Sequence, residues 1–319
     1  MTNSSTLLEK DNLTCWIITE GMIGTQNQCV GVAEALGITP IIKKIGLRQP
    51  WKTLSPWLQF ENSNSFTPKL SPPWPDLLIA SGRKSIAASR YIKKQSGGKT
   101  FTVQIQDPKT KPNQFDLVAV PFHDNSRGNN IIVTDGAPNR ITSEKLEQAK
   151  ENFSHLFLAS PSPRVAVLIG GNSNTHKMTP AITRRMVDNL KELDASLMIT
   201  ASRRTGEENL KLIQQELNTG SNFIWNNEGE NPYWGMLAWA DYILVTSDSV
   251  SMLSDAATTG KPTYVIALEG SSAKFDRFHT HFQKIGASKP FEGKLEPWRY
   301  TPLNDAQKIA NFIKENWEN

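Results

Sequence analysis

Residues 242–266 read YILVTSDSVSMLSDAATTGKPTYVI, and this stretch contains the pattern that decides the fold. Its first apolar run, Tyr242–Val245, predicts a buried strand, and the polar turn that follows leads into a helical pattern over Ser249–Thr259. Glycine, lysine and proline then end the helix, and Thr263–Ile266 predicts a second strand. Strand, helix and strand in this order are typical of a βαβ unit, in which the two strands are parallel.

The same alternation runs through most of the chain. In the first half, the predicted strands are Cys15–Thr19, Thr39–Ile45, Leu77–Ala80, Thr100–Gln104, Leu117–Val120 and Ile131–Val133. The predicted helices there are Gln26–Leu36, Lys84–Gln95 and Ser143–Phe153. In the second half, the further predicted strands are Val165–Ile169, Leu197–Thr200 and Phe223–Trp225. The further predicted helices are Pro180–Leu193, Glu207–Leu217, Tyr233–Trp239, Phe275–Ile285 and Asp305–Trp317. Serine and proline at 158–163 predict a linker between the two halves. The sequence therefore predicts an α/β protein with two Rossmann-like domains that face each other across a cleft.

Composition excludes several classes of protein. The 319 residues carry 35 Lys and Arg against 31 Asp and Glu, and a net charge of +4 over this length does not indicate a nucleic-acid partner. No apolar run approaches the roughly 18 residues of a membrane helix. Residues 1–14 lack the basic start of a signal peptide, so a cytoplasmic protein is expected, with at most peripheral contact at the inner membrane surface. Cys15 and Cys29 are expected to be small buried hydrophobic residues.

The segment Leu47–Pro75 stands apart because it contains six prolines and three tryptophans. Prolines at this density disfavour a regular helix or a central strand. We therefore expect a long ordered loop with aromatic anchors, and a mobile surface loop is the alternative. Weak contact with an anionic membrane, or with a lipid acceptor in it, would be expected here.

Familiar nucleotide and metal motifs are absent. There is no G-x-G-x-x-G, and Gly98-Lys99-Thr100 lacks the glycine that a P-loop requires five positions earlier, where Lys93 stands. No D-x-D pair and no histidine spacing typical of a metal site occurs. We expect neither a metal nor a cofactor.

The turn after Tyr242–Val245 is the strongest candidate for a binding site. Asp248, Ser249 and Ser251 stand at the start of a helix, where free N–H groups and the helix dipole favour a diphosphate. Asp255 lies about two turns further and could accept hydrogen bonds from ribose hydroxyls. The alternative is a simple N-cap followed by a solvated acid.

Two other strand ends in the same domain carry suitable residues. Ser202, Arg203 and Arg204 follow one strand, and paired arginines can hold phosphate oxygens. Gly170, Gly171 and Asn172 follow another, where glycines would let the backbone approach a ligand. A solvated basic turn and a tight turn are the alternatives.

The first domain offers candidates for an acceptor and a base. The glycine-containing loop after Cys15–Thr19 contributes candidate acceptor-side residues, which are Gly21, Gly24, Thr25, Gln26 and Gln28. His123 ends another strand beside Asp124, and histidine titrates near neutrality, so this pair is the candidate catalytic base and its orienting acid. A purely structural histidine is the alternative.

Taken together, these residues form a recognisable set. The matching motifs are Gly24-x-x-Asn27-Gln28, Pro121-x-His123-Asp124, Thr134-x-Gly136-Ala137, Ile169-Gly170-Gly171-Asn172, Thr200-x-Ser202-Arg203-Arg204-Thr205, Asn231-Pro232-Tyr233 and Asp248-Ser249-x-Ser251-Met252. The chain resembles the mitochondrial-fission (elongated-mitochondria) family, which in turn resembles GT-B glycosyltransferases. This resemblance implies an N-terminal acceptor-side domain (1–160), a C-terminal nucleotide-sugar domain (161–301) and a C-terminal helix (302–319) that crosses back to the first domain.

The resemblance also implies a function. A GT-B enzyme would transfer a sugar from a nucleotide-sugar donor to an unknown acceptor, a lipid or a glycan, without a metal. Asp248, Ser249 and Ser251 would contact the donor phosphates, and Asp255 would take the place of a ribose-binding acid. The alternatives are a non-catalytic GT-B scaffold or adaptor, as implied by the role of the plant members in fission, and a nucleotide-sugar epimerase.

Overall fold

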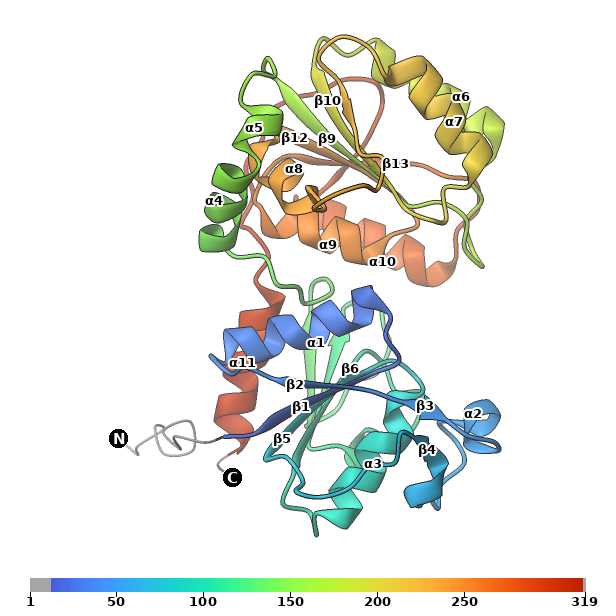
Figure 1. Ribbon diagram of the computed structural model, residues 1–319, viewed down its shortest axis with the longest axis vertical. Helices are drawn as coiled ribbons and strands as arrows, with labels where there is room; N and C mark the ends of the chain where they lie inside the picture. Colours follow the sequence, from blue (N-terminus) through green and yellow to red (C-terminus); the bar gives the residue numbers. More distant parts are fainter. Residues whose placement is uncertain (1–12, 318–319) are drawn as a thin grey trace. The chain divides into compact units, whose positions relative to one another are not determined.

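The computed structural model describes residues 13–317, which form two compact units (Figure 1). Unit 1 comprises the chain up to Arg140 together with residues from Asn304 onward. Unit 2 comprises Ile141–Leu303. Most of residues 1–14, whose composition predicts a cytoplasmic protein, lie outside the described part of the chain.

Unit 1 is built on a parallel sheet with strand order β2-β1-β5-β6-β7-β8. Its elements are β1 (Cys15–Thr19), α1 (Ile23–Ala35), β2 (Ile41–Lys44), β5 (Leu77–Ser81), α3 (Ser85–Gln95), β6 (Phe101–Ile105), β7 (Leu117–Pro121), β8 (Ile131–Thr134) and α11 (Asp305–Trp317). Successive side chains of a strand point to opposite faces, so each face of the sheet has its own core. Ile17 and Ile79 pack under α1 and α11, whereas Leu78 and Ala80 pack against α3.

The C-terminal helix belongs to unit 1. Ile309, Ala310 and Ile313 of α11 are fully buried against the same core as β1 and β5. The Asp305 carboxylate accepts hydrogen bonds from the backbone N–H groups of Asp135 (3.0 Å) and Gly136 (2.8 Å). These contacts attach the start of α11 to the loop after β8.

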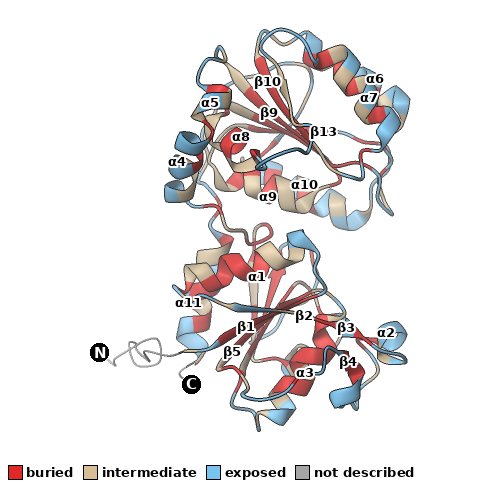
Figure 2. Ribbon diagram, in the orientation of Figure 1, coloured by how far each residue is buried: buried red, intermediate tan, exposed pale blue. Residues whose placement is uncertain are grey.

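Unit 2 repeats the architecture, with strand order β11-β10-β9-β12-β13-β14. Its elements are α4 (Ser143–Asn152), α5 (Ser154–Phe157), β9 (Arg164–Ile169), α6 (Pro180–Lys191), β10 (Ser196–Ala201), α7 (Glu207–Leu217), β11 (Phe223–Ile224), α8 (Tyr233–Trp239), β12 (Tyr242–Thr246), α9 (Val250–Thr258), β13 (Thr263–Ile266), α10 (Ala273–Lys284) and β14 (Lys289–Pro290). One face packs against α6 and α7, and the other against α4, α8, α9 and α10. Figure 2 shows the buried strands of both units in red.

The boundary predicted at 160 differs from the structure, because α4 and α5 belong to unit 2. Phe153 and Phe157 pack into the core of unit 2 with Met236 and Leu237 of α8. A Cβ on Gly235 would lie 2.7 Å from the ring of Phe153, so glycine at this position permits the close packing. The serine and proline residues at 158–163 therefore form a loop inside unit 2, and the chain passes between the units at 140–141 and 303–304.

The proline-rich segment is ordered, but it is not only loop. A short antiparallel ribbon, β3 (Gly46–Leu47) with β4 (Phe66–Thr67), closes it, and α2 (Trp51–Leu54) and the 3-10 turn η1 (Ser63–Ser65) lie within it. Trp51 and Trp74 pack against the core as anchors, whereas Trp57 is exposed. The predicted anchoring is thus correct for two of the three tryptophans.

Other expectations about the fold hold for the described residues. The α/β class with two Rossmann-like units is confirmed. Cys15 and Cys29 are buried, and burial raises the pKa of the Cys15 thiol to about 12. Among residues 13–317, no helix combines the length and apolar character needed to cross a membrane.

Candidate functional site

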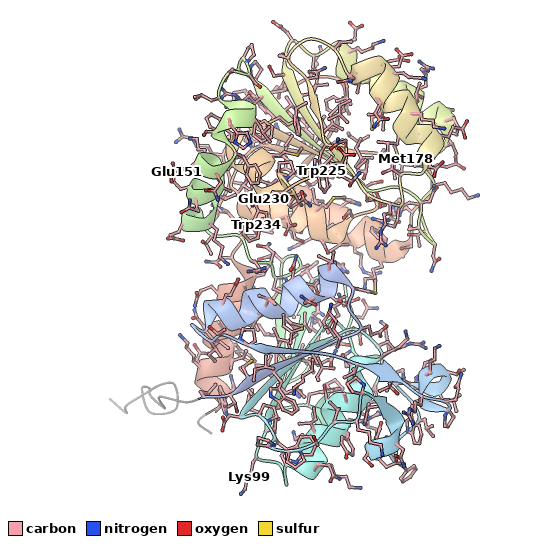
Figure 3. All side chains as sticks on the ribbon, viewed as in Figure 1. Lys99, Glu151, Met178, Trp225, Glu230 and Trp234 are labelled. Carbon is pink, nitrogen blue, oxygen red and sulfur yellow. The ribbon has the colours of Figure 1, made fainter. Side chains whose placement is uncertain are left out.

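Three neighbouring strands of unit 2 end at one edge of its sheet. Because β10, β9 and β12 are adjacent and parallel, the loops after their carboxyl ends meet. These loops are Gly170–Asn172, Ser202–Thr205 and Ser247–Ser249, so the structure brings together most of the residues predicted to bind a donor. Figure 3 places Met178 of the loop before α6 in the same unit.

The Asp248 side chain joins the three loops. It is fully buried, and its oxygens accept hydrogen bonds from the Thr246 hydroxyl (2.7 Å) and the Gly171 N–H (3.1 Å). Arg204 forms an ion pair with the same carboxylate at 2.5 Å. These internal partners surround the carboxylate, and the contact with donor phosphates predicted for Asp248 stays a prediction. Asp248 positions Arg204 and the Gly170-Gly171 turn.

Gly170 and Gly171 are required by the protein itself. A Cβ on Gly170 would lie 2.3 Å from Asp248 Oδ2, and a Cβ on Gly171 would lie 2.2 Å from the carbonyl oxygen of Arg204. Gly171 also has a φ of +137°, which side-chain-bearing residues rarely adopt. Close packing of the loops is by itself a reason for both glycines, and approach of a ligand to this turn stays a prediction.

The turn after β10 faces inward through its hydroxyls and outward through its arginines. The hydroxyls of Ser202 and Thr205 donate to the carbonyl oxygen of Gly170 at 2.6 and 2.7 Å. Arg203 is exposed and makes no ion pair within residues 13–317, whereas the half-exposed Arg204 is paired with Asp248. Asn172 accepts from the Met178 N–H (3.0 Å) through its side-chain oxygen. Arg203 is therefore the cation of this turn that is available to a ligand.

The first turn of α9 is adjacent to the arginine turn. Ser249 is its N-cap, and its hydroxyl accepts from the Met252 N–H at 3.3 Å. The simple N-cap role therefore applies to Ser249, while Ser251 is partly exposed in the first turn. The amides of this turn retain the positive end of the helix dipole.

Asp255 is held by an aromatic partner that the sequence pattern does not reveal. The Tyr233 hydroxyl at the start of α8 donates to Asp255 Oδ2 at 2.9 Å. Burial raises the pKa of the Asp255 carboxyl to about 7, so this group is partly protonated near neutral pH. Figure 3 labels Trp225, Glu230 and Trp234 around the loop that leads from β11 into α8.

Two histidines, His176 and His279, also lie beside this edge. His279 Nε2 is 2.8 Å from the carbonyl oxygen of Ser247, the residue before Asp248. His176 is buried and its ring lies 4.6 Å from that of Phe275, which in turn stacks on His279. Burial lowers the pKa of both histidines, so both are neutral at pH 7. A neutral His279 must carry its proton on Nε2 to donate to Ser247.

In unit 1, the predicted acceptor-side residues gather at the carboxyl end of β1. Gly21 and Gly24 are exposed, and the Thr25 hydroxyl donates to the carbonyl oxygen of Met22 at 3.0 Å. Gln26 donates its N–H to the same carbonyl. Gln28 is buried and accepts from the Gln106 side chain at 3.0 Å.

The candidate catalytic base, His123, and its orienting acid, Asp124, follow the end of β7, on the same edge of the sheet. His123 is 2% exposed and Asp124 is 3% exposed. The β7 strand is separated from β1 by β5 and β6, so at about 4.8 Å per strand His123 lies roughly 14 Å along the edge from the β1 loop. The strand that leads to His123 is therefore three positions along the sheet from the strand that leads to Gly21–Gln26.

Within residues 13–317, no group of three or more His, Cys, Asp or Glu side chains could hold a metal ion. The candidate site thus consists of arginines, helix-terminal amides and hydroxyls. Positive charge and N–H donors of this kind suit a phosphate group.

Residues 23–317 match the model of the family described as Mitochondrial fission ELM1. The chain belongs to this family. It is 31% identical over 270 residues to Mitochondrial fission protein ELM1 of Arabidopsis thaliana, a match covering 75% of this chain and 63% of that protein. It is 29% identical over 288 residues to Uncharacterized protein RP120 of Rickettsia prowazekii (strain Madrid E), covering 75% of this chain and 79% of that one.

Solved structures show the same fold at low sequence identity. The UDP-GlcNAc 2-epimerase from Methanocaldococcus jannaschii superposes with a TM-score of 0.56 at 12% identity, covering 95% of this chain and 99% of that chain. Spinosyn Forosaminyltransferase SpnP superposes with a TM-score of 0.52 at 13% identity, covering 96% and 95%. This ELM1-family chain therefore has the GT-B fold.

Proposed function

We propose that this ELM1-family protein is a GT-B-type glycosyltransferase that binds a nucleotide-sugar donor in unit 2 without a metal. The observation that carries the proposal is the carboxyl edge of the unit 2 sheet, where the ion pair between Arg204 and Asp248 holds the arginine turn beside the first turn of α9. The exposed Arg203 and the amides of α9 would bind the diphosphate of the donor.

These groups suit the chemistry of sugar transfer. An acceptor hydroxyl attacks the anomeric carbon while the bond from that carbon to the diphosphate oxygen breaks, and the acceptor proton passes to a base. Negative charge then develops on the leaving diphosphate, which arginine and helix-terminal N–H groups stabilise. Asp255 is proposed to accept a hydrogen bond from a ribose hydroxyl, an interaction for which its ionised form is the stronger acceptor.

We propose that unit 1 binds the acceptor and provides the catalytic base. The exposed loop Gly21–Gly24 offers backbone groups to an acceptor, a lipid or a glycan. His123 is the proposed base, and its burial requires that the loop after β7 moves before an acceptor reaches the ring. The substitution His123→Ala should abolish turnover and leave donor binding unchanged; unchanged turnover would remove His123 from the role.

Donor binding is tested by thermal unfolding and calorimetry with UDP, GDP, ADP, CDP and their sugar conjugates. A ligand at about 100 times its Kd should stabilise unit 2 by about 2.7 kcal/mol. Since a charge-assisted hydrogen bond contributes about 1.5–3 kcal/mol, Arg203→Gln should weaken binding by roughly 10- to 100-fold. The matched control is Arg185→Gln, because Arg185 is an exposed arginine on α6 of the same unit.

The same experiments separate this proposal from its alternatives. No stabilisation by any nucleotide would refute the donor site and favour a non-catalytic scaffold. Isomerisation of a bound sugar nucleotide without an acceptor would instead identify an epimerase. Equal binding by wild type and Arg203→Gln would show that the arginine turn is not the phosphate site.

A further inference from the structure

A loop of unit 1 that is anchored to helix α3 exposes apolar side chains to solvent. Residues 48–65 connect β3 to β4, and α3 supports them through Arg90. The Arg90 guanidinium donates to the carbonyl oxygens of Pro56 (2.7 Å) and Leu58 (2.8 Å) and pairs with the Glu61 carboxylate. The side chains of Arg90 and Glu61 are only 9% and 7% exposed, so this ion pair lies beneath the loop.

The tip of this loop is apolar and exposed. Phe60 is 86% exposed, Trp57 is 68% exposed and Leu54 is 46% exposed. Phe60 has a φ of +71°, a conformation that costs a non-glycine residue roughly 1–2 kcal/mol. The buried ion pair and the hydrogen bonds from Arg90 thus hold the loop against this strain, with the apolar tip, defined as Leu54, Trp57 and Phe60, in contact with water.

The segment that carries the apolar tip is rich in positive charge. Residues 41–73 contain five basic residues, Lys43, Lys44, Arg48, Lys52 and Lys69, and one acidic residue. The acidic residue is Glu61, which Arg90 already neutralises. The excess of four within this segment equals the net charge of the entire chain, so the positive charge of the protein is concentrated here.

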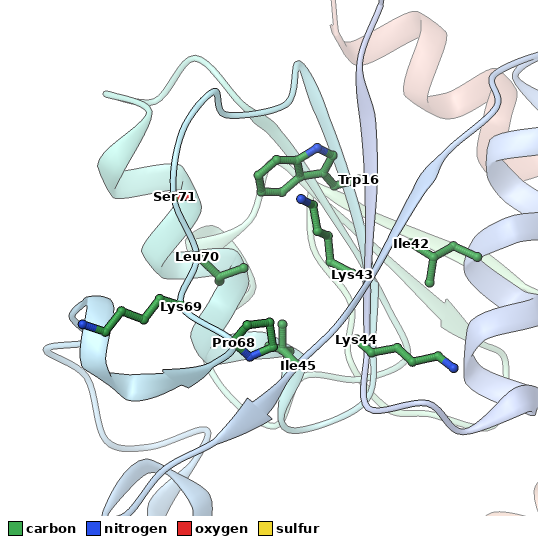
Figure 4. Close-up of a pocket in the computed structure, with 9 residues that line it drawn as sticks. All are labelled: Trp16, Ile42, Lys43, Lys44, Ile45, Pro68, Lys69, Leu70 and Ser71. Atoms are coloured by element: carbon green, nitrogen blue, oxygen red, sulfur yellow. The ribbon is translucent and has the colours of Figure 1, made fainter.

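A basic pocket lies at the other end of the β3–β4 ribbon. It has a volume of about 260 Å³ and is lined on one side by Lys43 and Lys44 and on the other by Pro68 and Lys69 (Figure 4). The Lys43 ammonium sits over the ring of Trp16, 4.2 Å from its centre. The ribbon has two residues in each strand, so the pocket and the base of the loop are separated by about 7 Å of strand.

We propose that the apolar tip and the basic residues of segment 41–73 dock on an anionic lipid bilayer. Tryptophan and phenylalanine partition into the bilayer interface, and basic residues of the same segment can meet the phosphates of anionic headgroups. The apolar tip is exposed to solvent, which fits insertion of its side chains into a bilayer interface. This inference rests on unit 1 and is independent of the donor proposed for unit 2.

The test is co-flotation of the full chain with two kinds of vesicle. One is pure phosphatidylcholine, and the other is phosphatidylcholine mixed with phosphatidylglycerol. We expect binding to the anionic vesicles only, and release at high salt. Each lysine near an anionic surface contributes about 1 kcal/mol, so Lys44→Gln with Lys69→Gln should weaken partitioning by roughly 25-fold. Trp57→Ser with Phe60→Asn should weaken it at least tenfold, and asparagine tolerates the positive φ.

A matched control removes the same kinds of side chain from unit 2. Leu158→Ser with Lys211→Gln and Lys284→Gln deletes one exposed apolar and two exposed basic residues, and vesicle binding should not change. Thermal unfolding confirms that each variant is folded. The proposal is overturned if wild type fails to bind anionic vesicles, or if the unit 1 variants bind as wild type does. A change of oligomeric state in Trp57→Ser with Phe60→Asn would overturn it too, since the apolar tip would then join two copies.

Discussion

The substitution Gly170→Ala tests whether the glycine turn serves the protein or a ligand. The new Cβ would lie 2.3 Å from Asp248 Oδ2, much closer than real Cβ contacts. The carboxylate cannot withdraw freely, because it holds Thr246, Gly171 and Arg204. Overpacking of this kind costs about 1–3 kcal/mol. In a unit of this size, about 2 kcal/mol corresponds to a fall in Tm of roughly 4–8 °C.

A double-mutant cycle of Gly170→Ala and Asp248→Ala measures the clash between the new Cβ and the carboxylate. Asp248→Ala alone should cost about 3–5 kcal/mol, since it leaves buried donors without an acceptor. Gly170→Ala should add nothing in the Asp248→Ala background, because the clashing oxygens are gone. The expected coupling is therefore about 1–3 kcal/mol, measured by urea unfolding of the four proteins without ligand. Additive effects would refute the reasoning and would point to another reason for glycine at this position.

Two further predictions concern stability and pH. Because burial raises the pKa of Asp255 from 3.8 to about 7, the folded state binds its proton more tightly than the unfolded chain does. The protonated Asp255 therefore contributes its whole stabilisation below pH 4, and this contribution is lost as pH rises through 7. Because asparagine does not titrate, the Tm of Asp255→Asn minus the Tm of wild type should increase from pH 5 to pH 8. A constant difference across this range would contradict the raised pKa. Arg90→Ala leaves the buried Glu61 carboxylate without its partner and should destabilise unit 1 by about 3–5 kcal/mol and speed proteolysis within residues 48–65; cleavage at the wild-type rate would show that Arg90 does not anchor the loop.

Local sequence patterns predict the elements well, and the reason is physical. An apolar run such as Val165–Ile169 can be satisfied only by burial on both faces of a sheet, and the periodicity of Glu207–Leu217 can be satisfied only by a helix with one buried face. Both patterns lie within a short stretch of consecutive residues, so they can be recognised without knowledge of the tertiary structure. The β9, β12 and α7 elements accordingly lie within about one residue of the predicted bounds.

The domain boundary could not be read in this way. Serine and proline at 158–163 have the composition of a linker, but composition does not say which core receives the helices before it. That choice depends on Phe153 and Phe157 fitting against α8, where Gly235 lacks a side chain more than 75 residues away along the chain.

For the candidate site, the sequence by itself determined which residues stand at the strand ends of unit 2, because parallel strands must place their carboxyl ends on one edge. Only the tertiary structure decided which way each side chain faces. Asp248 turns inward to Gly171 and Arg204, Asp255 meets Tyr233, and His123 is buried, whereas Arg203 stays exposed. The physical reason is that a polar side chain turns toward its hydrogen-bond partners, and these partners lie 22 to 77 residues away in the sequence.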